Sequence, residues 1–231
     1  MIKARNIVAL VGAQRLARFT AAGFLASTGT AMHEWNFRAA GAILATAGRM
    51  EVLVRHAVSE QLTNLGLASG STNWPLGVPL DPHESRVIRR AYKETSETGH
   101  APIKPEEVVE QVPLGFWLQL MSNRYHTRLW VPAIRHGFPH LPGTATQGRE
   151  AMRAWLERAV SLRNLAAHVH PLHVLDPKDA IEPFEFVAAA ISSEAAEWVV
   201  ESSQISQVWG ARPAPDSARI PPQNRDGESG A

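Results

Sequence analysis

Three polar residues in the C-terminal half of the chain could together transfer protons and hold a phosphate: Arg163, Asn164 and His168. On a helix, Asn164 and His168 lie on one face, one turn apart, whereas Arg163 is rotated from His168 by about 140° and reaches it only through its long side chain. The imidazole titrates near neutral pH, the guanidinium can stabilise a phosphorane, and the amide can orient its neighbours. Cleavage of RNA by its own 2′-hydroxyl requires such groups, so the trio contains the parts for that reaction.

The spacing alone has a simpler interpretation. A chain with 19 arginines and 10 histidines is expected to contain about one such Arg–His pair by chance. A second pair, Arg135 and His140, does occur, but it spans a glycine and a proline and is therefore expected in a loop. For the first pair, the alternative is that His168 caps the helix and Arg163 pairs with a carboxylate on a neighbouring helix.

A run of histidines, His168, His170 and His173, with Asp176 and Asp179 downstream, makes a metal-dependent phosphoesterase a further alternative. Imidazoles two residues apart point to different sides of a helix, so they converge only if the chain leaves helical geometry before the following proline. We therefore expect no metal and no other cofactor, and we expect His170 and His173 at the mouth of the site or in solvent.

The composition restricts the class of protein. The 231 residues are 45% hydrophobic and carry a formal net charge of +1, which excludes a histone-like polycation and means that RNA contact requires a local basic patch. The absence of cysteine excludes a disulfide framework, a cysteine zinc site and a thiol nucleophile. No apolar run approaches the ~20 residues of a membrane span, and the N-terminus lacks a convincing signal-cleavage site. These features predict a cytoplasmic protein without a membrane partner.

Apolar residues recur at helical spacing along nearly the whole chain, and no segment alternates like a strand. Gly66 is the expected C-cap of the longest helix, and Gly41 and Gly48 are expected to bend that helix or to admit a close neighbour. The predicted helices cover 7–24, 31–65, the segments that open at Pro82 and Pro105, the block after Pro113, 146–169, 177–191 and 194–209. The sequence thus predicts an all-α, multi-helix bundle over residues 1–212 and a disordered tail over residues 213–231.

Two further groups of residues, one aromatic and one basic, each have a structural and a functional interpretation. The aromatic residues expected in the core, rather than on a base-stacking surface, are Trp35, Phe116, Trp117 and Trp130. The arginines expected on a solvated helix face, with phosphate binding as the alternative, are Arg86, Arg89 and Arg90.

The segment from Arg163 to His168 resembles the R-N-x-x-x-H signature of HEPN domains, and further blocks resemble the Abi-like (abortive infection) proteins of bacteria. These blocks are His33-Glu34-Trp35-Asn36, Glu51 to Arg55, Val112 to Trp117, Asn123 to Tyr125, Leu129-Trp130, Arg163 to Leu172 and the helix at Trp198. In this order they span about residues 5–213. Two parts of the pattern differ, because a histidine follows Arg55 where the family has Asn, and Val-His follows His168 where the family has His-Glu.

The resemblance implies a HEPN-like bundle and a metal-independent endoribonuclease that acts in phage defence or as a toxin. Arg163 would stabilise the phosphorane, Asn164 would orient its neighbours, and His168 would transfer protons. The residues implied to position the substrate are Glu51, Arg55 and His170. For Glu51 and Arg55 an ordinary ion pair on one helix is the alternative.

The resemblance also implies partners. They are an RNA substrate, a second copy of the chain with Arg163 and His168 near the two-fold interface, and an antitoxin or a non-coding RNA. The alternative of another class is a non-catalytic HEPN module that binds RNA or protein in the same groove. RNA cleavage that is lost in His168→Ala would distinguish the enzyme from the binding module.

Overall fold

The chain folds into a bundle of helices. The computed structural model describes residues 9–20, 26–68, 70, 73–97 and 103–214, and within these ranges every regular element is helical and none is a strand. The α-helices are α2 (Ala13–Thr20), α3 (Ala26–Ala68), α4 (Trp74–Gly77), α5 (Pro82–Glu97), α6 (Pro105–Glu110), α7 (Leu114–Leu120), α8 (Ala145–Ala167), α9 (Pro177–Ala189), α10 (Ser193–Glu201) and α11 (Ile205–Gly210). Two 3₁₀ turns, η1 (Asn123–Tyr125) and η3 (Ile134–Gly137), flank a π-helical turn, η2 (His126–Trp130). The predicted all-α class is confirmed.

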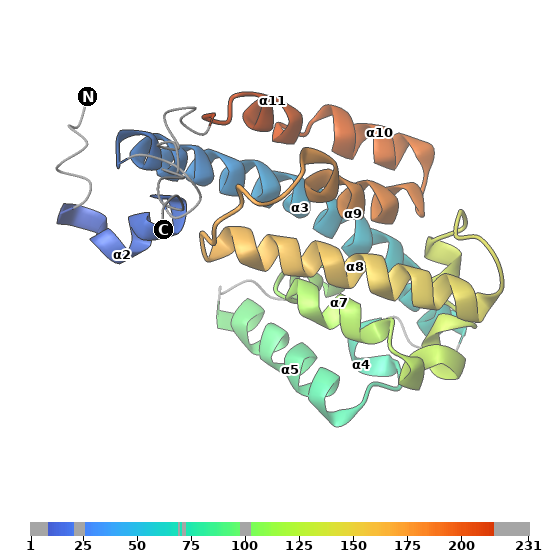
Figure 1. The fold of residues 1–231 in the computed structure, drawn as a ribbon. Coiled ribbons are helices and arrows are strands. Elements are labelled where there is room, and N and C mark those ends of the chain that lie inside the picture. The colour runs from blue at the N-terminus through green and yellow to red at the C-terminus, as the bar shows by residue number, and fades with distance from the viewer. Residues whose placement is uncertain (1–8, 21–25, 69, 71–72, 98–102, 215–231) are drawn as a thin grey trace, which may run out of the picture.

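Helix α3 is the axis around which the other helices pack. Its 43 residues give it a length of about 64 Å. Figure 1 shows α8 running antiparallel to α3, so that the end of α8 meets the beginning of α3. Contacts of α3 with α2, α8, α9 and α11 follow from apolar residues spaced three or four apart, which form one buried stripe. This stripe includes Met32, Trp35, Ile43, Met50, Val54, Val58 and Leu62.

Local signals determine where most helices begin. Proline occupies the first position of α5 and of α6, and Pro113 immediately precedes α7, as predicted. Helix α8 begins after Thr144, which forms a capping box with Gln147. The side chain of Asp176 caps α9, and the side chain of Ser192 caps α10. These boundaries need no tertiary contact, which explains why the sequence alone predicts them.

Several predicted helix boundaries are wrong. The first predicted helix is interrupted at Gly12, whose φ of +84° is left-handed and which separates residues 9–11 from α2. Helix α3 continues through Gly66 to Ala68. Gly41 and Gly48 admit no close neighbour, because a Cβ atom added at either position would meet no described atom within 4 Å. The last predicted helix is two helices, α10 and α11, which the segment 202–204 separates.

The aromatic core is as predicted, since Trp35, Phe116, Trp117 and Trp130 are all buried. The basic edge of α5 is an exposed helix face, on which Arg90 bonds to Glu94. Most of the predicted tail, residues 215–231, lies outside the described residues. No helix within the described ranges is both long enough and apolar enough to cross a bilayer.

A buried polar cluster attaches α5 to the turns η1 and η2. Glu84 of α5 is buried and accepts hydrogen bonds from the Tyr125 hydroxyl at 2.9 Å and from Arg124 Nη2 at 2.5 Å. The Tyr125 hydroxyl oxygen in turn accepts a hydrogen bond from the backbone N–H of Asp81 at 3.0 Å. Burial raises the pKa of Glu84, but the hydrogen bonds and the nearby Arg124 charge outweigh it and leave this pKa below its ordinary value. The carboxylate of Glu84 is therefore a charged, fully bonded part of the core.

Candidate functional site

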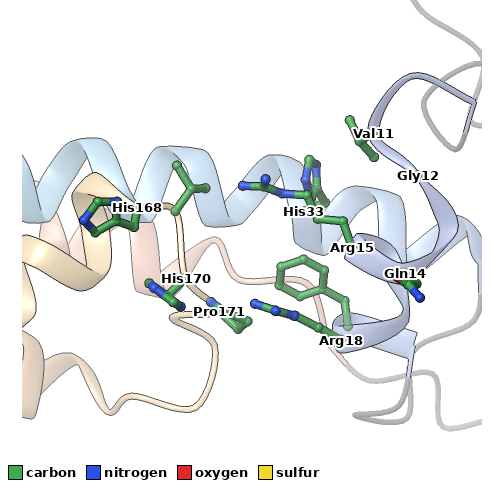
Figure 2. A pocket seen from close by; sticks show the side chains of 11 residues that line it. Val11, Gly12, Gln14, Arg15, Arg18, His33, His168, His170 and Pro171 are labelled. Carbon is green, nitrogen blue, oxygen red and sulfur yellow. The ribbon is translucent and has the colours of Figure 1, made fainter.

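A cavity of about 420 Å³ lies where the end of α8, the beginning of α3 and helix α2 meet. The α2 wall is formed by Gln14, Arg15, Arg18 and Phe19, the α3 wall by His33, and the remaining wall by residues 168–171 after α8. In Figure 2 the side chains of Arg15 and Arg18 extend from α2 towards the side on which His168 and His170 lie. Among the described residues that line this cavity, all charged or ionisable side chains are arginine or histidine, and none is a carboxylate.

His168 stands at the C-cap of α8 rather than inside the helix. Its backbone φ and ψ are −90° and 5°, and its N–H still donates to the carbonyl of Asn164 at 3.1 Å. Its exposed ring faces the ring of His170, with the two centroids 6.2 Å apart and the planes at 82°. The predicted helix to residue 169 is thus slightly too long, and this early end brings both imidazoles to one cavity.

The chain reverses after α8 through a valine in the left-handed conformation. Val169 has a φ of +51°, its N–H donates to Ala166, and the N–H of His170 donates to Leu165, both at 2.9 Å. This pair of bonds is a Schellman motif, in which glycine normally occupies the position of Val169. A β-branched residue there costs on the order of 1–2 kcal/mol. The left-handed turn at Val169 directs residues 168–170 towards the cavity.

Asn36 of α3 holds this reversed segment in place. The buried Asn36 amide donates through Nδ2 to the carbonyl of His170 at 3.0 Å and accepts through Oδ1 from the N–H of Leu172 at 2.7 Å. Its neighbour Trp35 donates through Nε1 to the carbonyl of Val208 at 2.7 Å, which ties α3 to α11. The Trp-Asn pair therefore ties both the segment after α8 and helix α11 to α3.

The structure does not bring Arg163 into the cavity with His168. Arg163 and Asn164 are exposed, and Arg163 Nη1 donates to Asn164 Oδ1 at 3.3 Å. Neither residue lines the cavity. Within the described ranges, Arg163 makes no ion pair with a carboxylate of another helix, so that part of the alternative interpretation is not seen, whereas His168 does occupy a capping position.

Glu51 and Arg55 lie far along α3 from the cavity. They form an ion pair on one face of the helix, and Arg55 Nη2 also donates to the carbonyl of Val112 at 3.2 Å. Arg55 follows Asn36 by 19 residues in the same helix, which corresponds to about 28 Å. In this structure the pair fixes the segment before α7 and does not contact Arg163.

No motif in the sequence assigns a role to His33, which forms the inner wall of the cavity. Its side chain is 2% exposed, and its ring makes edge contacts with Phe19 at 5.7 Å and Phe37 at 5.0 Å. Neither ring nitrogen has a hydrogen-bond partner among the described residues. Burial lowers the pKa of His33, the nearby Glu34 opposes that effect, and the Arg15 charge adds to it. This imidazole is therefore neutral around pH 7 in the free protein.

Arg15 and Arg18 were also not predicted as site residues. They lie three apart on α2, on a helix that packs against α3 through the buried Leu16 and Phe19. The spacing of Leu16 and Phe19 indicates an amphipathic helix, and its polar face carries both arginines. Only the docking of α2 beside the end of α8 shows that this face lines a cavity.

The residues of the metal alternative are dispersed. The ring of His173 packs against Phe19 at 5.4 Å, and the side chain of Asp176 caps α9 by accepting from the N–H of Lys178 at 2.8 Å. In the part of the chain that is described, no group of three or more His, Asp or Glu side chains is placed to hold a metal ion.

Comparison of the chain with protein-family models, with curated proteins and with solved structures gives no match in any of the three. The resemblance to Abi-like and HEPN proteins therefore stays a prediction, and the function is argued from the cavity and its side chains.

Proposed function

We propose that this protein is a metal-independent endoribonuclease with a HEPN-like bundle, related to the Abi-like proteins. The observation that carries the proposal is the pairing of His168 with a cavity whose ionisable side chains, among the described lining residues, are all arginine or histidine. Such a lining attracts the anionic phosphodiester and, among the described residues, supplies no carboxylate ligand for a metal ion, while the exposed imidazole of His168 can accept and donate a proton.

In the proposed reaction the 2′-oxygen of one nucleotide attacks the adjacent phosphorus, and the bond from phosphorus to the 5′-oxygen breaks. His168 accepts the proton of the attacking hydroxyl and, as an imidazolium, returns it to the leaving 5′-oxygen, so that the neutral imidazole is restored. The products are a 2′,3′-cyclic phosphate and a 5′-hydroxyl, so the step needs no metal-bound water. His170, across from His168, positions the phosphate at the mouth of the cavity.

Arg163 and Asn164 have supporting roles in this proposal. Their mutual hydrogen bond holds the guanidinium beside the last turn of α8, where an RNA strand that leaves the cavity meets a positive charge. Because Arg163 is outside the cavity, a role in stabilising the phosphorane requires its side chain to turn towards His168 when RNA binds. The contact with Asn164 supports an orienting role for the amide.

The location of Arg163 also favours a second candidate, a non-catalytic module that binds RNA in the same cavity. The charges of the cavity suit binding as well as catalysis, and the cation of the predicted trio is not assembled in the free protein. In either case we propose action in phage defence or as a toxin, with an antitoxin or non-coding RNA as regulator and a homodimer as the working form.

The test is cleavage of a structured RNA by the full chain in excess EDTA. We expect cleavage with 2′,3′-cyclic phosphate ends, and we expect His168→Ala to lower the rate by roughly 10²–10⁴ while RNA affinity changes little. His136→Ala, at an exposed histidine of η3 outside the cavity, is the matched control. RNA binding without cleavage by the unmodified protein would favour the binding module. Loss of cleavage in EDTA with rescue by zinc or manganese would contradict the mechanism.

A further inference from the structure

The inner part of the cavity has a chemistry that the proposed reaction does not use. His168 and His170 stand at the wall after α8, whereas His33, Arg15 and Arg18 form the opposite walls. These three side chains offer nitrogen donors, and no carboxylate among the described lining residues competes for them. The reaction at His168 needs none of them directly.

His33 is the first sign that this inner part receives a ligand. A buried polar group without a partner costs about 1–3 kcal/mol, so most such groups are hydrogen-bonded. The His33 ring is 2% exposed, lines the cavity, and has no hydrogen-bond partner among the described residues. A neutral imidazole can donate one hydrogen bond, which an anion in the cavity would accept.

The two arginines of α2 are the second sign. Arg15 and Arg18 are neighbours on one helix face, and Figure 2 shows both side chains directed across the cavity, with Arg15 reaching beside His33. Neither makes an ion pair with a carboxylate within the described ranges. Two guanidinium groups that reach into one cavity, without an acidic partner among the described residues, suit a phosphate, whose oxygens accept bidentate hydrogen bonds.

We propose that Arg15, Arg18 and His33 form a phosphate-binding subsite, separate from the reacting groups at His168. The binding of a phosphate group follows from this geometry, whereas its assignment to an RNA strand rests on the proposed function. The strand would place one phosphate between α2 and α3 and the scissile phosphate at His168. Two guanidinium charges match the dianion of a terminal phosphate better than the single charge of a diester, so a 5′- or 3′-phosphorylated end is the preferred occupant.

Binding of inorganic phosphate to the full-length protein, followed by calorimetry and by the NMR signals of the histidine rings, tests the subsite without any cleavage. We expect Arg15→Ala and Arg18→Ala each to weaken phosphate binding about tenfold or more. The matched control is Arg86→Ala, at an exposed arginine of α5 that does not line the cavity. The His33 ring signals should shift when phosphate is added to the unmodified protein.

His33→Leu separates binding from folding. Leucine has a similar volume and no polar atom to leave unpaired, so we expect this variant to be at least as stable as the parent and to bind phosphate more weakly. Equal phosphate affinity in the parent and in all three variants, or no phosphate binding by the parent, would overturn the subsite. Two 2′-deoxy oligonucleotides, which cannot be cleaved, then identify the source of the phosphate: tighter binding of the end-phosphorylated one assigns a terminal group, and equal binding assigns an internal one.

The subsite and the nuclease can fail separately. If His168→Ala binds phosphate as the parent does, the subsite stands whatever the RNA assay shows. If the parent binds phosphate through Arg15 and Arg18 but cleaves no RNA, the nuclease proposal fails and the subsite remains. If RNA is cleaved and phosphate binding does not depend on α2, the nuclease proposal stands and the subsite fails.

Discussion

Asn36 and Leu172 lie 136 residues apart in the sequence, and the backbone N–H of Leu172 donates to the buried Oδ1 of Asn36 at 2.7 Å. The Nδ2 group of the same amide donates to the carbonyl of His170 at 3.0 Å. Both bonds flank Pro171, which has no N–H of its own to donate. One side chain of α3 therefore determines the path of the segment that carries His168 and His170.

Replacing Asn36 should destabilise the fold and release this segment. In Asn36→Ala the buried N–H of Leu172 and the partly buried carbonyl of His170 lose their partner, and we expect the free energy of unfolding to fall by about 2–4 kcal/mol in urea. Asn64→Ala, at an exposed position of the same helix, should change it by less than about 0.5 kcal/mol. An equal effect of the two substitutions would show that the amide of Asn36 does not hold the segment.

Val169→Gly should stabilise the protein. Glycine removes the left-handed strain of about 1–2 kcal/mol, and its greater freedom in the unfolded chain offsets about half of that, so the expected gain is about 0.5–1 kcal/mol. Val52→Gly is the matched control, because Val52 is exposed inside α3 and glycine there should cost about 1 kcal/mol. Chemical unfolding measures both, and a loss of stability in Val169→Gly would contradict the strain at this position.

Ionisation of Tyr125 should destabilise the folded protein at alkaline pH. Burial raises the pKa of Tyr125 to about 12, and the hydrogen bond to Glu84 adds to the shift. The pKa of Tyr125 in the folded protein lies above its value of about 10 in the unfolded chain. The stability that the neutral Tyr125 hydroxyl contributes is therefore fully present below pH 10 and is lost as the pH rises through 12. We expect Tyr125→Phe to lower stability at pH 7 by about 1–3 kcal/mol and to remove this alkaline loss.

The control for Tyr125 is Tyr92→Phe, which removes a hydroxyl that donates to Asn73 at 2.6 Å in a half-buried position. Unfolding between pH 9 and pH 12 should keep the alkaline loss in this variant. If Tyr125→Phe and Tyr92→Phe both retained the alkaline loss of stability, that loss would not arise from Tyr125.

The proposed homodimer can be tested at the end of α8. Leu165 is 38% exposed and lies next to Arg163 and Asn164, so an interface near His168 would cover it. Sedimentation should show a dimer, Leu165→Glu should shift it to the monomer, and cleavage should fall with dissociation. Leu76→Glu, at an exposed leucine of α4, should leave the dimer intact. A parent protein that is monomeric at assay concentrations and still active would contradict the homodimer.

The sequence predicts the beginnings of the helices better than their ends. Pro82, Pro105 and Pro113 mark starts through local geometry that any helix obeys. The end of α8 is different, because a valine occupies the left-handed position and glycine, the usual signal, is absent. The contact that fixes this turn comes from Asn36, far away in the sequence, so no local pattern reveals it.

The site was predicted only in part for the same reason. Composition and spacing single out His168 and its neighbours, but Arg15, Arg18 and His33 reach the cavity through the packing of α2 and α3. One signal in the sequence could have indicated His33: it lies one turn before Asn36 on the buried stripe of α3, where an apolar residue is expected. A histidine at such a position either has a buried partner or faces a cavity.

The attachment of α2 gives the cavity one wall that opens more readily than the others. Among the described side chains of α2, Leu16 and Phe19 are the buried ones, and burying two such residues stabilises by about 3–6 kcal/mol. Gly12, with its positive φ, separates α2 from residues 9–11, so the preceding turn does not continue the helix. Native-state hydrogen exchange should therefore be faster for the amides of α2 than for those of α8, and phosphate that bridges α2 to α3 should slow the exchange of α2 alone.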